Sequence, residues 1–381
     1  MSTAHVLNAD CLAALRDMPD ASVDAVVTDP PYGLSNTTPT QVADTITRWV
    51  TGDREYLPTG RGFMGHEWDG FVPPVAVWDE CLRVLKPGGH LLAFAGSRTQ
   101  DLMGLAVRLA GFEIRDSIAW LHAQGFPKAK SQLKPAHEPI ILARKPPKGS
   151  IAANVLEHGT GALNIDACRI YATDDDRALM EARSHPNGTK AGSDGGGIAM
   201  QFDKPHGFKS HPSGRWPANV VLDESQAAEL DRQSGNVKTG ATKPHRRDPD
   251  SSPMFKVGKW MTHSQPASEG GASRFFYVAK APKSERPVVD GVAHSTVKPV
   301  TLMRWLVRMV TPPGGTVLDP FAGSGTTLEA AMLEGFNAVG VEREADYLPL
   351  IQARIDRATA ELAARAEAEG DTLFPIDGAA S

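Results

Sequence analysis

Four residues near the start of the chain, Asp29-Pro30-Pro31-Tyr32, combine the groups needed to hold a planar amine. They follow residues 23–28, a short apolar run rich in valine that predicts a buried strand ending at a sheet edge. Proline fixes φ and has no N–H to donate, so the Asp29 carboxylate and the Pro30 carbonyl present acceptor oxygens on a stiff loop. The Tyr32 ring adds a flat stacking face. These groups suit an amino-bearing nucleobase, although Asp-Pro-Pro after a strand is also an ordinary turn.

A second stretch near the other end of the chain, residues 316–327, reads Thr-Val-Leu-Asp-Pro-Phe-Ala-Gly-Ser-Gly-Thr-Thr. It predicts a strand, a glycine-rich turn and then a helix at 328–333, the start of a Rossmann-type nucleotide-binding unit. The next predicted strand, 338–341, ends in Glu342, close to the spacing of about 20 residues that separates such a turn from a ribose-binding carboxylate. The turn is neither Gly-x-Gly-x-x-Gly nor a P-loop, which disfavours NAD and ATP.

Asp10 follows a predicted strand start at residues 5–10 and precedes a helical pattern that begins at Leu12. It is therefore either the N-cap of that helix or a ligand-binding carboxylate at the carboxyl end of a strand. The residues alone leave both interpretations open.

The elements that must position these residues alternate along the chain. Helical spacing is found at 75–85, 99–110, 297–310 and 345–369, and buried strands are predicted at 90–95, 112–121 and 138–143. This alternation predicts an α/β fold with a doubly wound, mostly parallel sheet that is covered on both faces and has right-handed crossovers. Residues 34–75 are polar and rich in threonine and glycine, and we expect them to form a mobile loop over the site.

The middle of the chain differs in character. Residues 151–290 are rich in Gly, Pro, Asp, Ser and Lys, have weak periodicity and predict a loop-rich insert. A basic segment lies within it, and two further lysines lie in a loop before the strand at 138–143. These charges are either solvated surface charges or contacts to phosphate groups. The candidates for DNA contact are Lys128, Lys130, Lys238, Lys243, Arg246 and Arg247.

Composition sets broad limits. The chain has 381 residues, 41% hydrophobic and 22% charged, and a net charge of -5, so any nucleic-acid surface requires local segregation of charge. No apolar run reaches the roughly 18 to 20 residues of a membrane span, and the N-terminus lacks a signal-peptide pattern, so we expect a cytoplasmic protein without a membrane partner. Cys11, Cys81 and Cys168 are isolated and predict buried thiols rather than a zinc site.

Together, Asp-Pro-Pro-Tyr and the Phe-x-Gly-x-Gly-Thr turn resemble the S-adenosylmethionine-dependent DNA amino-methyltransferases, which methylate the exocyclic amine of adenine or cytosine. The catalytic loop precedes the cofactor loop, which looks like the circularly permuted motif order of the β group of that family. Residues 294–299 resemble the family's His-Pro-Thr-x-Lys-Pro element, with Ser295 in place of its proline. The resemblance covers most of residues 1–150 and 290–360.

The resemblance implies four regions. These are a catalytic half at 1–150, a target-recognition insert at 151–290, a cofactor-binding half at 291–360 and a flexible acidic tail at 361–381. It also implies S-adenosylmethionine as the cofactor. By the same resemblance the residues that bind the cofactor are Asp10, Cys11, Thr296, Lys298, Asp319, Pro320, Phe321, Ala322, Gly323, Ser324, Gly325, Thr326, Glu342 and Arg343.

The roles within that set also follow from the resemblance. Asp10 would meet the adenine of the cofactor, Glu342 the ribose hydroxyls, and residues 319–326 the methionine portion. The element at 294–299 would help to hold the cofactor's carboxylate.

The implied reaction acts on duplex DNA and uses Asp29, Pro30, Pro31 and Tyr32. The target base is flipped out and stacked on Tyr32, and Asp29 with the Pro30 carbonyl accepts the amine hydrogens before the sulfonium methyl transfers in line. No metal is required.

Adenine N6 is the first choice because the form Asp-Pro-Pro-Tyr is typical of the adenine enzymes. Cytosine N4 is the alternative. An RNA or protein-glutamine methyltransferase, or a non-catalytic DNA-binding or cofactor-sensing module, is less favoured. Many β-group relatives are dimers, but no stretch of the chain decides between monomer and homodimer, and none predicts the recognition sequence or a restriction partner.

Overall fold

The computed structural model describes residues 2–60, 62, 67–123, 125, 130, 133–174, 176, 211–239, 268–280, 287–289, 291–294 and 296–372. The chain separates into two compact units. The first unit comprises Met1–Cys168, Asn219–Glu224 and Ala279–Ser381, and the second comprises Arg169–Ala218 and Ser225–Val278. The four-region organisation inferred from sequence, including target recognition by the insert, stays a prediction.

Nine strands of the described residues form the main sheet, in the order β1-β13-β12-β2-β3-β5-β4-β6-β9. Their bounds are β1 (Ala4–Asn8), β2 (Val23–Thr28), β3 (Leu85–Phe94), β4 (Glu113–Leu121), β5 (His137–Arg144), β6 (Val220–Asp223), β9 (Tyr277–Ala279), β12 (Thr316–Asp319) and β13 (Asn337–Glu342). The pairs β1–β13, β13–β12, β12–β2, β2–β3 and β4–β6 are parallel, whereas β5 runs antiparallel to β3 and β4. This mixed, mostly parallel sheet confirms the predicted Rossmann-like fold class, while the circular permutation of its motifs stays a prediction.

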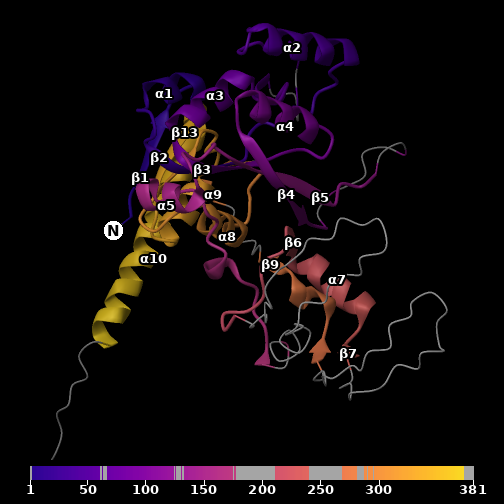
Figure 1. The fold of residues 1–381 in the computed structure, drawn as a ribbon, viewed down its shortest axis with the longest axis vertical. Coiled ribbons are helices and arrows are strands. Elements are labelled where there is room, and N and C mark those ends of the chain that lie inside the picture. The colour runs from indigo at the N-terminus through magenta and orange to yellow at the C-terminus, as the bar shows by residue number, and fades with distance from the viewer. Residues whose placement is uncertain are drawn as a thin grey trace, which may run out of the picture. The chain divides into compact units, whose positions relative to one another are not determined.

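Helices lie on both sides of this sheet in the first unit (Figure 1). One hydrophobic core joins the sheet to α1 (Cys11–Asp17), α3 (Val75–Val84) and α4 (Gln100–Leu109). Four further helices are α5 (Ile151–His158), α8 (Val300–Val310), α9 (Thr326–Leu333) and α10 (Leu348–Thr372). α5 packs against β3, and α9 packs against both α8 and α10. α8 buries one apolar stripe, whereas all eight residues of α9 are buried. The layers hold the carboxyl ends of the parallel strands in fixed positions.

The expectation of a mobile loop at residues 34–75 was wrong for part of this stretch. It contains the helix α2 (Pro39–Thr51), which begins with a capping box between Thr38 and Gln41 and ends at Gly52 in the left-handed conformation. Trp49 on this helix is fully buried and donates its indole N–H to the Tyr56 carbonyl at 2.9 Å. The buried tryptophan fixes the helix to the core, so polar composition alone misled the prediction.

Two other boundaries differ from expectation. β3 begins at Leu85. The sequence Lys86-Pro87-Gly88-Gly89, which falls between the helix predicted at 75–85 and the strand predicted at 90–95, therefore lies within the strand. The strand tolerates this sequence because Gly88 takes φ +76° and the pairing of β2 with β3 shifts register between Val23 and Ala25. The region expected to be loop-rich also contains α5 and, further along the chain, α7 (Glu224–Ser234).

The remaining elements are short. β7 (Val237–Thr239) and β8 (Ser268–Gly270) form an antiparallel pair in the second unit. Within the same unit the Arg215 guanidinium lies 2.7 Å from Oδ2 of Asp176. The backbone of Arg215 forms an antiparallel bridge with that of Ile170. β10 (Val288–Val289) and β11 (Val292–Ala293) form a second small hairpin.

No helix in the described part of the chain combines the length and the apolar character needed to cross a bilayer. The cytoplasmic location stays a prediction.

Candidate active site

The two stretches that dominate the sequence meet at one edge of the sheet. β2 and β12 are parallel neighbours, so Asp29, which follows β2, and Asp319, which ends β12, emerge at the same edge. The hydroxyl of Thr28 donates to Oδ1 of Asp319 at 2.6 Å, and the backbone N–H of Phe321 donates to the same oxygen at 3.1 Å. The first of these hydrogen bonds joins residues that are 291 positions apart.

The Asp-Pro-Pro-Tyr loop is held in place by Asp69. Its Oδ1 accepts the backbone N–H groups of Tyr32 at 2.8 Å and Gly33 at 2.9 Å, and its Oδ2 accepts that of Leu34 at 3.4 Å. The hydroxyl of Thr99 donates to the Tyr32 carbonyl at 2.6 Å. Sequence reasoning missed Asp69 because the residue lies in a stretch taken for a mobile loop, and no local motif marks it.

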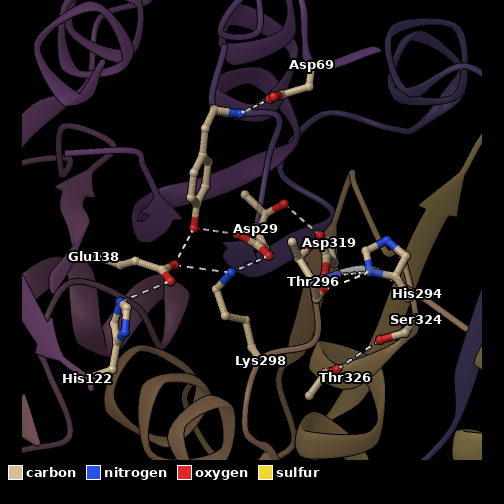
Figure 2. A network of polar contacts seen from close by, with 12 residues as sticks. Asp29, Asp69, His122, Glu138, His294, Thr296, Lys298, Asp319, Ser324 and Thr326 are labelled. Atoms are coloured by element: carbon tan, nitrogen blue, oxygen red, sulfur yellow. Dashed lines mark hydrogen bonds and ion pairs between the residues drawn. The ribbon is translucent and has the colours of Figure 1, made fainter. Parts of the chain in front are cut away.

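A cluster of charged and polar side chains surrounds Asp29 (Figure 2). The Lys298 ammonium lies 2.6 Å from Oδ2 of Asp29 and 3.3 Å from Oε2 of Glu138. The Tyr32 hydroxyl lies 2.8 Å from Oδ1 of Asp29 and 2.7 Å from Oε2 of Glu138. One hydroxyl hydrogen can be donated to only one of these carboxylates at a time. Tyr32 and Lys298 therefore couple two carboxylates, of which the sequence indicated only one.

Electrostatics keep this cluster charged. Burial opposes the charge of Lys298, but Asp29 and Glu138 outweigh it and raise the pKa of the lysine. Burial also opposes ionisation of Glu138, yet Lys298 and the Tyr32 hydroxyl hold the pKa of that carboxyl below its usual range. Burial and the two carboxylates raise the pKa of Tyr32 well above normal. At neutral pH the tyrosine is thus a neutral donor between charged neighbours.

The glycine-rich turn is built around Glu342 at the end of β13. The backbone N–H of Gly323 donates to Oε2 of Glu342 at 2.7 Å, and that of Glu344 donates to Oε1 at 2.8 Å. Gly323 takes φ +54°, and a Cβ there would lie 3.1 Å from Nε2 of His294. Glycine is therefore favoured by the backbone conformation, and a side chain there would also crowd the histidine ring.

Two further carboxyl groups lie beside this turn. Burial raises the pKa of Asp319 to about 6, although hydrogen bonds from Thr28 and other donors oppose the shift. Asp10 caps α1 by accepting the backbone N–H groups of Leu12 at 3.0 Å and Ala13 at 3.2 Å. The N-cap interpretation of Asp10 is thus confirmed, and the residue also lines the cavity described next.

Most of these residues, including Asp10, Lys298 and Glu342, line one cavity of about 1010 Å³ in the first unit. Its walls include Asp29, Pro30, Pro31 and Tyr32, together with Trp68 and Phe71. Of the residues predicted to bind the cofactor, Gly325 does not line the cavity. The thirteen that do are Asp10, Cys11, Thr296, Lys298, Asp319, Pro320, Phe321, Ala322, Gly323, Ser324, Thr326, Glu342 and Arg343. The fold therefore brings together two sets of residues that lie far apart in the sequence.

A protein-family model described as DNA methylase, of the N6/N4 type, matches residues 23–353. The match spans both the Asp-Pro-Pro-Tyr loop and the glycine-rich turn. The chain belongs to the N6/N4 DNA methylase family. Membership confirms the resemblance inferred from the two stretches and is consistent with S-adenosylmethionine as the cofactor of this DNA methyltransferase.

Individual relatives of the methylase include two curated proteins. DNA adenine methyltransferase YhdJ of Escherichia coli is 22% identical over 363 residues, which cover 93% of this chain and 83% of YhdJ. Type II methyltransferase M.HinfI of Haemophilus influenzae is 41% identical over 63 residues, 16% of this chain and 18% of that protein.

Solved structures are also similar to the methylase. TTHA0409 of Thermus thermophilus, solved in complex with S-adenosyl-L-methionine, is 19% identical with a TM-score of 0.42, and the match covers 94% of each chain. The PvuII DNA methyltransferase, described as cytosine-N4-specific, is 14% identical with a TM-score of 0.45, and the match covers 94% of this chain and 91% of that one.

The basic residues predicted to contact DNA are mostly outside the described part of the methylase. This holds for Lys128, Lys243, Arg246 and Arg247, while Lys238 falls in β7 with its side chain not described. Lys130 is exposed. All six stay predictions.

The cysteines are placed mostly as expected in the methylase. Cys81 and Cys168 are buried, whereas Cys11 is partly exposed at the wall of the cavity. Burial, followed by the charge of Asp10, raises the pKa of the Cys11 thiol to about 12, so the side chain is a neutral thiol at physiological pH.

Proposed function

We propose that this DNA methyltransferase transfers a methyl group from S-adenosylmethionine to the N6 amine of an adenine flipped out of duplex DNA. The observation that carries the proposal is the shared cavity, whose walls include Asp29, residues of the glycine-rich turn that begins at Asp319, and Glu342. An acceptor for an amine and a turn of the kind that binds nucleotides thus lie on the walls of one cavity.

The target amine needs help because its lone pair is delocalised into the ring of the base. The Asp29 carboxylate and the Pro30 carbonyl accept its two hydrogens, which favours the pyramidal nitrogen that attacks. Tyr32 supplies the stacking face for a base that has left the helix, a step that costs a few kcal/mol in such enzymes. Positioning of this kind lowers a barrier by roughly 7 to 11 kcal/mol in favourable cases. The residues therefore perform the reaction by orientation and charge.

The chain's own residues fit the cofactor. The Glu342 carboxylate stands at the end of β13, where a ribose-binding carboxylate is expected, and Gly323 leaves room that a side chain would fill. Asp10 and Cys11 would meet the adenine, and the turn from Asp319 to Thr326 would hold the methionine portion, with Gly325 shaping the turn. S-adenosylmethionine supplies the sulfonium-bound methyl group.

Thr296 and Arg343 complete the proposed cofactor set. Lys298 was expected to help hold the cofactor's carboxylate, yet its ammonium contacts Asp29 and Glu138. We therefore assign Lys298 mainly to the charge balance around Asp29.

Adenine is favoured over cytosine by the form of the catalytic loop, Asp-Pro-Pro-Tyr. The name of YhdJ, a DNA adenine methyltransferase related over 93% of this chain, supports the same choice. We assign target recognition to the insert at residues 151–290. We assign phosphate contact to Lys128, Lys130, Lys238, Lys243, Arg246 and Arg247.

The test is modification-sensitive sequencing of DNA from a methylation-free host that expresses either the protein or its Asp29→Ala variant. We expect N6-methyladenine at one motif with the protein and none with the variant, while calorimetry shows that both bind S-adenosylmethionine. N4-methylcytosine instead would establish the cytosine alternative. A normal level of methylation by Asp29→Ala would refute the assigned mechanism, and binding without any mark on DNA would favour a non-catalytic module.

A further inference from the structure

The cluster around Asp29 has more negative than positive charge. Two carboxylates, Asp29 and Glu138, flank the single ammonium of Lys298, at 2.6 Å and 3.3 Å respectively. The pKa shifts of Lys298 and Glu138 both favour their charged forms. Once Lys298 has offset one carboxylate, one negative charge is left over.

Neighbouring groups do not remove this excess. Nε2 of His122 lies 3.5 Å from Oε1 of Glu138, but burial lowers the pKa of His122 and keeps the imidazole neutral. Burial does the same to His294 on the other side of the cavity. Arg343 also lines the cavity, but its guanidinium pairs with Glu344 at 2.9 Å and is half exposed. Water therefore screens the charge of Arg343 much more than that of Lys298.

The same imbalance extends over the whole cavity. Eight carboxyl side chains line its described walls, against the two permanent cations Lys298 and Arg343. Three of these carboxylates already serve the fold. Asp10, Asp69 and Glu342 each accept backbone N–H groups, which explains their presence without a ligand.

Glu138 differs from those carboxylates because the cluster itself supplies its contacts. It stands near the start of β5, and its oxygens face Tyr32, Lys298 and His122 (Figure 2). No local structural need for a carboxylate is evident in this set of contacts. A glutamine there would keep the size of the side chain and a hydrogen-bonding oxygen while removing the surplus charge.

We propose that Glu138 is a specificity-determining residue that makes the cavity prefer a cationic sulfonium cofactor to its neutral thioether product. The inference rests on the proposed function. The sulfur of the cofactor is positive before methyl transfer and neutral afterwards, so a buried negative charge near it stabilises the donor selectively. Asp29 alone cannot provide this preference because Lys298 offsets its charge. Glu138 restores the net negative charge and thereby favours release of product over release of donor.

The size of the effect follows from one unit charge. At distances typical of one cavity and an effective dielectric constant near 20, removing a single charge changes the relative affinity roughly three- to thirtyfold. We expect Glu138→Gln to weaken the binding of S-adenosylmethionine by such a factor. The affinity for S-adenosylhomocysteine should stay nearly unchanged. In sinefungin a protonated amine replaces the sulfonium, so its binding to Glu138→Gln should weaken by a similar factor.

The experiment is titration calorimetry of the full chain with these three ligands. Glu138→Gln is compared with Glu113→Gln, which removes the same charge from neighbouring β4, where Glu113 pairs with Arg144 at 2.6 Å outside the cavity. Glu138→Asp keeps the charge and should retain most of the preference. Thermal melting checks that each variant folds.

The outcomes separate the two proposals. A drop in the ratio of the product's Kd to the donor's Kd that is confined to Glu138→Gln supports the inference. An unchanged ratio of the two Kd values, or equally weakened binding of all three ligands, overturns the inference. The proposed function still stands in that case if the unaltered protein methylates DNA. Failure of the unaltered protein to bind S-adenosylmethionine overturns the proposed function itself.

Discussion

The hydroxyl of Thr28 donates to Oδ1 of Asp319 across the boundary between β2 and β12, at 2.6 Å. Both residues are buried, and each is the last residue of its strand. The Asp-Pro-Pro-Tyr loop begins directly after Thr28, and the glycine-rich turn begins directly after Asp319. The bond therefore fixes the position of one functional loop against the other.

Replacing Thr28 with valine tests this connection. Valine has the same shape but cannot donate, so the Asp319 carboxylate loses a buried hydrogen bond, a loss of about 1 to 3 kcal/mol. We expect the Thr28→Val variant to unfold at lower urea concentration and to bind S-adenosylmethionine more weakly. Thr28→Ser keeps the hydroxyl and is the matched control. Equal stability of the two variants would show that the hydrogen bond does not contribute.

Asp319 should make stability depend on pH in an unusual direction. Burial raises its pKa in the folded state to about 6, from an unfolded value of 3.8. The folded chain therefore binds more protons than the unfolded chain between these values, and the free energy of unfolding falls as pH rises from about 4 to about 6. The contribution is at most about 3 kcal/mol, since each pKa unit corresponds to about 1.4 kcal/mol.

The check compares urea unfolding of the protein and of Asp319→Asn at several pH values from 4 to 7. Because other groups also titrate in this range, only the difference between the two curves reports on Asp319. We expect that difference to change with pH up to about 6 and to level off above it. A difference that stays constant with pH would contradict the raised pKa.

The parts of the site that the sequence predicted are those with a local signature. Asp29 and Asp319 follow short apolar runs, and Glu342 follows another at the spacing of a ribose-binding carboxylate. A buried strand and a glycine-rich turn are encoded within a few residues, and parallel strands align their carboxyl ends. These local signals predicted each half of the cavity at the end of a strand, and the pairing of β2 with β12 in the structure brings the halves together.

The parts that it missed depend on tertiary contacts or on a signal that was passed over. Glu138 looks like an ordinary strand residue, and only the fold brings it to Lys298. Asp69 likewise acquires its role by meeting the backbone of the catalytic loop. The capping box of Thr38 and Gln41, by contrast, was visible in the sequence and should have identified α2.

Lys298 should stabilise the protein across the neutral range. The pKa of Glu138 is lowered in the folded state. Its contribution to the free energy of unfolding is therefore present above the unfolded pKa near 4.5 and is lost as pH falls. The pKa of Lys298 is raised, so its contribution is present below 10.5 and is lost as pH rises beyond that value. Lys298→Met leaves two carboxylates facing each other without a cation. Removing one partner of a buried ion pair lowers the free energy of unfolding by about 3 kcal/mol.

The expected result for Lys298→Met is a loss of stability that is largest between about pH 6 and pH 9. It should shrink toward pH 4, where protonation relieves the unpaired carboxylates. Urea unfolding over this range provides the measurement, and Lys148→Met, at an exposed lysine, provides the control. A loss that does not vary with pH would indicate lost packing rather than lost charge.

Asp69 should control the rate of methyl transfer more than the binding of the cofactor. Its carboxylate holds the backbone N–H groups of Tyr32, Gly33 and Leu34, and so sets the position of the catalytic loop without taking part in the chemistry. Misplacing a reactive group by about 1 Å lowers a rate by about 100-fold. We expect Asp69→Ala to reduce kcat by roughly 10- to 100-fold, with little change in the Kd for S-adenosylmethionine.

The matched variant is Asp69→Asn, which keeps one carbonyl oxygen able to accept the N–H groups of Tyr32 and Gly33. Its kcat should lie between those of the protein and of Asp69→Ala, because the geometry of the loop is retained with a weaker acceptor. Single-turnover methylation of duplex DNA measures the rate, and calorimetry measures the cofactor affinity of the same samples. A fall in cofactor affinity that matches the fall in rate would assign Asp69 to the stability of the whole cavity. A loss of rate alone places its effect on the Asp-Pro-Pro-Tyr loop.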